Sequence, residues 1–136
     1  MTNDELRRKI AERLGYRVRQ QQEGIWFHKW YLSAPDGWNA LGDPSGLGYF
    51  FDTPEQVWAW VADHKDAIPN WPEDIAAAIN LLAEMIEGRL VAHRGWWSVE
   101  MIDVDGIELE FTNDNPARPI CEAWLAWDEQ KARGTG

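Results

Sequence analysis

The chain has 136 residues, 45% of them hydrophobic, which is enough for one core and too few for two ordinary domains. Its formal net charge of −10 argues against a protein that binds nucleic acid directly by neutralising phosphates. No apolar run is long enough to span a bilayer, and the charged N-terminal sequence does not resemble a secretory signal. We therefore expect a cytoplasmic protein without membrane contact.

The first predicted element is a helix over residues 3–14. Thr2 and Glu5 form a capping-box pattern at its start, and Gly15 stands where a helix C-terminus favours a left-handed residue. Leucine and isoleucine recur between them at helical spacing.

Strand structure is predicted from Tyr16 to Ala34, most strongly over 25–32, because bulky and β-branched residues dominate there. A loop rich in glycine, proline and asparagine follows at 38–48, and the aromatic run 49–51 indicates a short strand. A Thr-Pro-Glu-Gln sequence then combines an N-cap, a first-turn proline and a capping-box glutamine. It predicts a helix over 54–65.

The second half begins with an amphipathic helix whose apolar positions run from Ile75 to Ile86. Gly88 is expected to end this helix. Residues 90–102 are predicted to be strand, and Asp105-Gly106 is the strongest hairpin signal in the chain. Residues 107–111 alternate apolar and acidic side chains, so this hairpin has one apolar and one acidic face. A last helix is expected over 120–131.

The two halves of the chain, residues 1–66 and 70–131, look like pseudo-repeats. Gly24-Ile25-Trp26 in the first half matches Gly95-Trp96-Trp97 in the second, and each half has the predicted order αββα.

The predicted fold class is therefore α+β. We expect an αβα sandwich with one antiparallel sheet of about four strands and four helices, built from two αββα repeats. Residues 1–131 form a single domain in this interpretation, and residues 132–136 form a flexible tail.

Three stretches of the second half resemble a known family. They are the helix start at 72–79, the Trp96-Trp97-Ser98-Val99 strand and the final helix start at 119–123. Over residues 71–131 the chain resembles the phage ABA sandwich domain family, although Glu122 stands where that family often has arginine. The resemblance implies a phage or prophage gene and an α/β sandwich, and it supplies no catalytic or binding residues to carry over.

The sequence offers no set of groups that an enzyme would need. No serine lies in a nucleophile elbow, no glycine-rich loop has the pattern of a phosphate-binding loop, and no spacing of ligands predicts a metal site. Cys121 is the lone cysteine, so it cannot form an internal disulfide, and we expect a buried, inert thiol. A protein without enzymatic activity, cofactor or metal is predicted.

Ten tryptophans make the aromatic residues the better candidates for function. In an extended strand, Trp26, His28 and Trp30 would share one face, and an uncovered face would suit stacking on a planar ligand. The alternative is that helices cover both faces and the rings are core. Trp38, in the glycine-rich loop, is either a binding-site residue or a ring folded back on the core.

Basic residues next to rings in the second half complete the candidate site. His93 and Arg94 precede Trp97, and Arg118 opens the last helix. Each base could meet a phosphate beside a stacking ring, whereas the alternative is an arginine that is solvated or paired with a carboxylate.

Two functions follow from these residues. The first is a non-enzymatic phage protein that binds a small anionic ligand, such as a nucleotide immune signal, and sequesters it in the host cytoplasm to counter host defence. The alternative is an acidic inhibitor that blocks a host protein, for example one that binds DNA. Exposed aromatics on a duplicated domain also favour a homo-oligomer.

Overall fold

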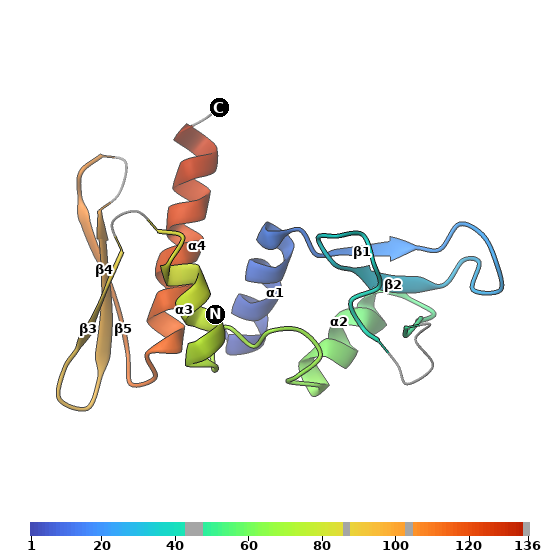
Figure 1. The fold of residues 1–136 in the computed structure, drawn as a ribbon, viewed down its shortest axis with the longest axis horizontal. Coiled ribbons are helices and arrows are strands. Elements are labelled where there is room, and N and C mark those ends of the chain that lie inside the picture. Colours follow the sequence, from blue (N-terminus) through green and yellow to red (C-terminus); the bar gives the residue numbers. More distant parts are fainter. Residues whose placement is uncertain (43–47, 86–87, 103–104, 135–136) are drawn as a thin grey trace. The chain divides into compact units, whose positions relative to one another are not determined.

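The structure is a computed structural model that describes residues 1–42, 48–85, 88–102 and 105–134. The chain divides into two compact units. We call Ala11–Pro69 the hairpin unit, and Met1–Ile10 together with Asn70–Gly136 the three-stranded unit. The mixed α+β class is confirmed, with four helices among the described residues (Figure 1). The single domain remains a prediction.

Helix α1 (Asn3–Leu14) has the predicted bounds, and its capping box is present. The Glu5 amide donates to Thr2 Oγ1 at 3.1 Å, and the Thr2 amide donates to Glu5 Oε2 at 3.4 Å. Helix α2 (Pro54–Asp63) also starts as predicted, with Thr53 as N-cap and a complete capping box. Both starts were predictable because every bond lies within one helical turn.

In the hairpin unit, strands β1 (Arg17–Gln20) and β2 (Trp30–Ser33) pair antiparallel. The predicted strand over 25–32 is wrong for residues 25–28, which form a turn. Gly24 has φ +84° and His28 has φ +69°, and neither conformation occurs in a strand. The His28 amide donates to the Gln21 carbonyl at 3.0 Å, which closes the turn.

The strands form two separate sheets, of two and three strands, rather than one sheet of about four. The reason lies at the second edge of β2, which residues from the same unit occupy. Trp30 and Phe51 exchange two backbone hydrogen bonds of 2.8 Å, and the Ala40 amide donates to the Leu32 carbonyl at 2.7 Å. Of the predicted strand at 49–51, Phe51 alone forms a bridge; residues 43–47 of the preceding loop lie outside the described residues.

The second sheet has the order β3 (Arg89–Ala92), β4 (Trp97–Ile102) and β5 (Glu108–Asn113), all antiparallel. The predicted strand over 90–102 is interrupted, because Gly95 has φ +84° and turns the chain between β3 and β4. The predicted hairpin after β4 is confirmed, with Gly106 at φ +80°; residues 103–104 lie outside the described residues.

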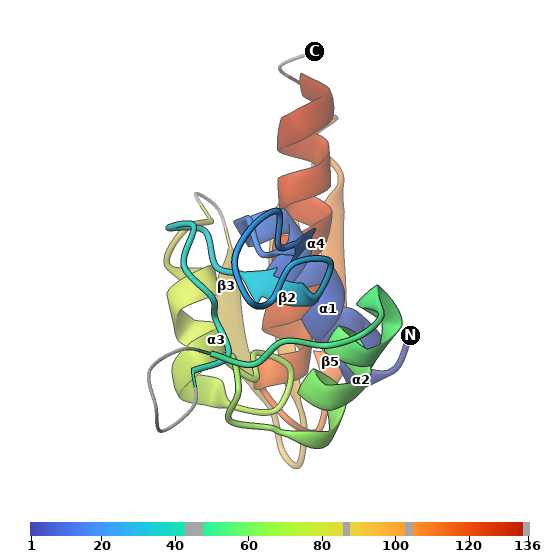
Figure 2. The same cartoon turned by 90° about the vertical axis from the view of Figure 1, so that its right-hand side faces the viewer.

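Helices α3 (Ile75–Leu82) and α4 (Ala117–Gly134) lie side by side and cover one face of this sheet (Figures 1 and 2). The sheet contributes the buried side chains of Val99 and Met101 to that layer. The other face, which carries Ser98, Glu100 and Ile102, has no helix of this unit on it (Figure 1).

Two helix predictions need correction. Helix α3 ends at Leu82, and its buried positions are Ala78 and Leu81, whereas Ile75 and Ile79 are exposed. Both stripes are apolar, so helical spacing alone could not choose between them; Ile86 lies outside the described residues.

Helix α4 begins at Ala117 instead of Ile120, because Asn115 accepts from the Ala117 amide at 2.9 Å and the first turn tolerates Pro119. The helix continues to Gly134, so residues 132–134 of the predicted tail are helical, and 135–136 lie outside the described residues.

The cores of the two units differ in composition. The three-stranded unit buries Trp124 and Trp71 with aliphatic side chains. In the hairpin unit, the buried hydrophobic side chains among the described residues are all aliphatic: Ala11, Leu32, Leu41, Val57, Val61 and Ile68. None of the helices described combines the length and the apolar character that crossing a membrane requires.

Candidate ligand-binding face

Residues 49–51, which lie beside β2, direct their aromatic rings to opposite sides of the β1–β2 sheet. Phe50 stacks on Trp26 with ring centroids 5.3 Å apart and an interplanar angle of 8°, and it lies 5.7 Å from the Tyr31 ring. Tyr49 and Phe51 instead meet Trp60 of α2, at 5.0 and 6.2 Å. This is the side-chain alternation of extended backbone.

Helix α2 therefore covers one side of the β1–β2 sheet, and the Trp26, Tyr31 and Phe50 rings lie on the other. Leu32 is fully buried on the α2 side, together with Val57 and Val61. We call the opposite surface the aromatic face and define it by Trp26, Tyr31, Phe50 and the Arg19 side chain described next.

Arg19 supplies a positive charge to the aromatic face. It lies directly opposite Tyr31 in the antiparallel register, and directly opposite residues project to the same face. Its side chain is exposed and makes no hydrogen bond or ion pair with any of the described residues.

Neighbouring cations of the hairpin unit are already engaged. The Arg17 guanidinium donates to the Glu12 and Tyr16 carbonyls, and Lys29 pairs with Asp52. Arg19 is consequently the cation of this face that is available to an anionic group.

None of the aromatic residues in the hairpin unit is buried; each is half-buried or exposed. Large rings usually supply the most apolar area to a core, so a unit in which no ring is fully buried is unusual. Exposed clusters of this kind mark places where a ligand or a protein binds.

The predicted residues of the first half take different positions. Trp26 joins the aromatic face, whereas Trp30 is on the α2 side, so the predicted common face of Trp26, His28 and Trp30 is wrong. The turn at 25–28 is the cause, because residues in a turn do not follow the alternation of side chains that begins with Trp30 in β2. The His28 ring lies 3.6 Å from the Phe27 ring. Trp38 is 77% exposed, and its amide donates to Asp36 Oδ1 at 3.0 Å.

His93 belongs to the turn between β3 and β4 in the three-stranded unit. Its ring stacks on Trp96 with centroids 3.6 Å apart, and its Nε2 lies 2.8 Å from Ser98 Oγ. A histidine beside a serine suggests a nucleophile and its base, but Ser98 is fully buried and no substrate could reach it. Arg94 is exposed in the same turn, and Trp97 projects to the helix-covered face with Val99.

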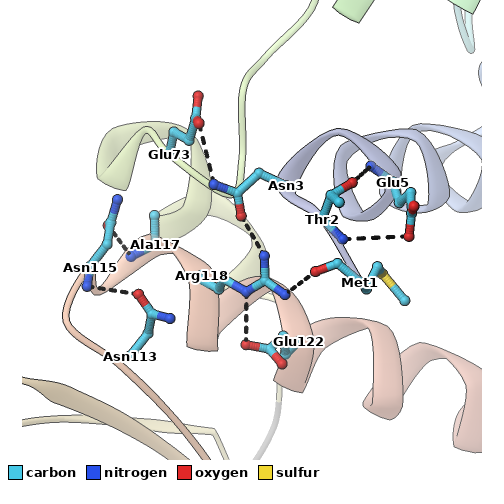
Figure 3. Close-up of polar contacts among 10 residues, drawn as sticks. All are labelled: Met1, Thr2, Asn3, Glu5, Glu73, Asn113, Asn115, Ala117, Arg118 and Glu122. Carbon is cyan, nitrogen blue, oxygen red and sulfur yellow. Dashed lines mark hydrogen bonds and ion pairs between the residues drawn. The ribbon is translucent and has the colours of Figure 1, made fainter.

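Arg118 is held by neighbouring groups rather than open to a ligand (Figure 3). Its guanidinium donates to Asn3 Oδ1 at 2.6 Å and to the Met1 carbonyl, and it pairs with Glu122 at 3.4 Å. Asn3 in turn donates to Glu73 Oε1 at 3.2 Å. This network ties the start of the chain to the start of α4, which corresponds to the alternative of a carboxylate-paired arginine.

The lone thiol is inaccessible, as predicted. Cys121 is fully buried, and burial raises the pKa of its thiol far above the ordinary value, with a smaller contribution from Glu122. Among the residues that the structure describes, no three His, Cys, Asp or Glu side chains are grouped so that they could hold a metal ion.

Sequence reasoning missed Arg19, Tyr31 and Phe50 as site residues. The alternation of 49–51 was visible in the sequence, but the pairing of Phe51 with Trp30 and of Arg19 with Tyr31 is a matter of register between separate segments. Comparisons of the chain with protein-family models, curated proteins and solved structures found no match.

Proposed function

We propose that this chain is a non-enzymatic binding protein that takes a small, planar, anionic ligand on its aromatic face. The observation that carries the proposal is the stack of the exposed Trp26 ring on the half-buried Phe50 ring beside Tyr31, with the available Arg19 guanidinium on the same face. A nucleotide has the matching chemistry, because its base can stack on a ring while its phosphate meets a guanidinium.

In the proposed complex, the aromatic rings bind the base and Arg19 binds the phosphate. Stacking of a base on an aromatic side chain contributes about 1–3 kcal/mol and tolerates different bases. Arg19 adds a bidentate phosphate contact, which is needed because the excess of acidic residues otherwise repels an anion.

The resemblance to the phage ABA sandwich domain family directs this proposal to host defence. A phage protein with such a face would sequester a nucleotide immune signal in the host cytoplasm and thereby prevent the signal from reaching its receptor. Sequestration requires affinity alone, which agrees with the lack of a recognisable catalytic set in the sequence.

Isothermal titration with cyclic AMP, cyclic di-AMP, cyclic di-GMP and ATP tests the proposal. We expect heat with at least one of them, and an affinity about tenfold or more lower for Trp26→Ala and for Arg19→Gln. Trp38→Ala and Arg94→Gln are the matched controls, because each removes an exposed group of the same type that is not part of the aromatic face as defined above. Absence of heat with every nucleotide, or equal losses in the controls, contradicts the proposal.

A protein partner is the second candidate, and the exposed apolar tip of the β1–β2 turn favours it. Ile25 is 87% exposed and Phe27 48%, in a turn that backbone hydrogen bonds hold in place. The proposed partner is a host protein. If the turn instead contacts a second copy of the chain, the result is a homo-oligomer. Pull-down from host lysate at low and high salt, with light scattering on the purified chain, separates these outcomes.

We retain, as a proposal, the origin of the chain from two αββα repeats in an αβα sandwich. Gly24 and Gly95, which the repeat aligns, both have φ +84° and both turn the chain between the first two strands of their unit. The segment at 49–51, whose Phe51 bridges Trp30, then corresponds to β5 of the second half.

A further inference from the structure

The uncovered face of the β3–β4–β5 sheet has a row of charges across all three strands. Arg89, Glu100 and Glu110 are successive cross-strand neighbours, since Arg89 pairs with Glu100 and Glu100 pairs with Glu110 in the antiparallel register. Glu108 lies two positions along β5, opposite Ile102. We call this surface the acidic face.

The charges of this face are not balanced. The Arg89 guanidinium pairs with Glu100, whereas Glu108 and Glu110 are exposed and have no hydrogen bond or ion pair with any of the described residues. Like charges directly opposite each other, as in Glu100 and Glu110, destabilise a sheet.

The surface around these carboxylates is hollowed and partly apolar. An open hollow of about 610 Å³ is lined by Arg89, Glu100, Met101, Ile102, Glu108, Leu109 and Glu110. Ile102 is 45% exposed at its end of β4. The opposite end of the face is closed, because the stacked His93 and Trp96 rings and the hydrogen bond to Ser98 cover it.

We propose that the acidic face docks a segment of a partner protein that carries lysine or arginine together with an apolar residue. Cationic side chains would lie between Glu108 and Glu110, and the apolar side chain would contact Ile102. Charge complementarity selects this occupant: a second copy of the same acidic face, a nucleic acid and an anionic membrane are all repelled by it. The inference is independent of the nucleotide proposal, and it gives the protein-partner candidate a surface in the other unit.

Fluorescence anisotropy with a labelled oligolysine peptide and a labelled peptide of alternating lysine and leucine tests this inference on the full chain. We expect the double variant Glu108→Gln/Glu110→Gln to bind both peptides about tenfold more weakly than wild type. Arg89→Gln should bind them more tightly, because it releases Glu100. Ile102→Ser should weaken binding of the leucine-containing peptide alone.

The matched control is Asp114→Asn/Glu129→Gln, which removes the same charge from exposed positions elsewhere in the three-stranded unit. It should change the affinity by less than about twofold, as an exposed charge away from the contact contributes little. An equal loss of peptide affinity in this control would show that binding depends on net charge alone, and it would overturn the inference. Displacement of both peptides by spermine or Mg²⁺ at matched charge would overturn it too, because the face would then hold small cations.

The variants also separate this inference from the proposals above. Ile25→Ser and Trp26→Ala should leave peptide binding unchanged, and Glu108→Gln/Glu110→Gln should leave the heat of nucleotide binding unchanged. Loss of peptide binding in the Ile25 and Trp26 variants would assign the peptide to the hairpin unit and overturn the acidic face as its site.

Discussion

Each of the two sheets has one face that the helices of its own unit leave uncovered, and the two faces differ in chemistry. The aromatic face presents the Trp26, Tyr31 and Phe50 rings with the Arg19 guanidinium. The acidic face presents exposed carboxylates on β5 near an exposed isoleucine. A face of the first kind suits a planar anion, and one of the second kind suits a cationic chain.

The units also use tryptophan in opposite ways. Trp124 is 2% exposed and its Nε1 donates to Glu84 Oε2 at 2.9 Å, so it serves the core of the three-stranded unit. Among the described residues of the hairpin unit the core is aliphatic, and each tryptophan is half-buried or exposed. An excess of tryptophan in a sequence therefore does not by itself indicate a binding site; the burial of each ring decides its role.

The largest test of this contrast is the removal of one tryptophan from each unit. Trp124→Ala should lower the free energy of unfolding by about 3–5 kcal/mol, because it opens a cavity and leaves Glu84 without its donor. Trp38→Ala should change it by less than about 0.5 kcal/mol, since the ring is exposed. Urea unfolding followed by circular dichroism measures both, and similar values for the two variants would remove the contrast.

Two arginines of the three-stranded unit provide the next comparison. Arg118→Ala should cost about 1–3 kcal/mol, because Asn3, the Met1 carbonyl and Glu122 all lose their partner. Arg89→Ala should cost less than about 0.5 kcal/mol, because its side chain is 72% exposed and the pair with Glu100 is in solvent. Thermal unfolding checks the order, and an equal loss in both would show that the Arg118 network contributes no more than a surface pair.

The turns aligned by the proposed repeat should respond alike. Gly24→Ala and Gly95→Ala should each destabilise by about 1–2 kcal/mol, because an L side chain is strained at the observed positive φ. The cause is conformational rather than steric, since an added Cβ has no neighbour within 4 Å at either site. Gly42→Ala, at a glycine without positive φ, is the control. Clearly unequal losses at Gly24 and Gly95 would argue against equivalent turns.

The smallest predicted effect depends on pH and on Cys121. The folded thiol stays protonated because burial raises its pKa, whereas the unfolded thiol ionises above about pH 8.5. The protonated folded state therefore loses stability relative to the unfolded state as the pH rises. Wild type should lose about 1 kcal/mol between about pH 8 and pH 9.5, and Cys121→Ala should lose less.

Denaturation midpoints across this range measure the difference between the two curves. Above this window the unfolded Tyr16 phenol begins to ionise near about pH 10. Tyr16 then adds a pH dependence of the same sign, because burial and, to a smaller extent, Asp36 raise the pKa of the folded phenol. Parallel curves for wild type and Cys121→Ala would assign the pH dependence to other groups.

The sequence by itself determined the features that depend on a few neighbouring residues. The starts of α1 and α2 were predictable because Thr2 with Glu5 and Thr53 with Gln56 complete their hydrogen bonds within one turn. The hairpin between β4 and β5 was predictable because the turn residues and the flanking alternation are adjacent. The acidic character of one face of β5 follows from the same alternation.

The tertiary structure alone decided which surfaces are open. Arg19 lies opposite Tyr31, and Phe51 opposite Trp30, because of the register between segments that are separated along the chain. A slip of one residue in that register would move each side chain to the other face of the sheet. The choice between the Ile75 stripe and the Ala78 stripe of α3 likewise depends on the helix packed against it. Local patterns fix where helices and turns begin, whereas the identity of an open face depends on partners that no local pattern specifies.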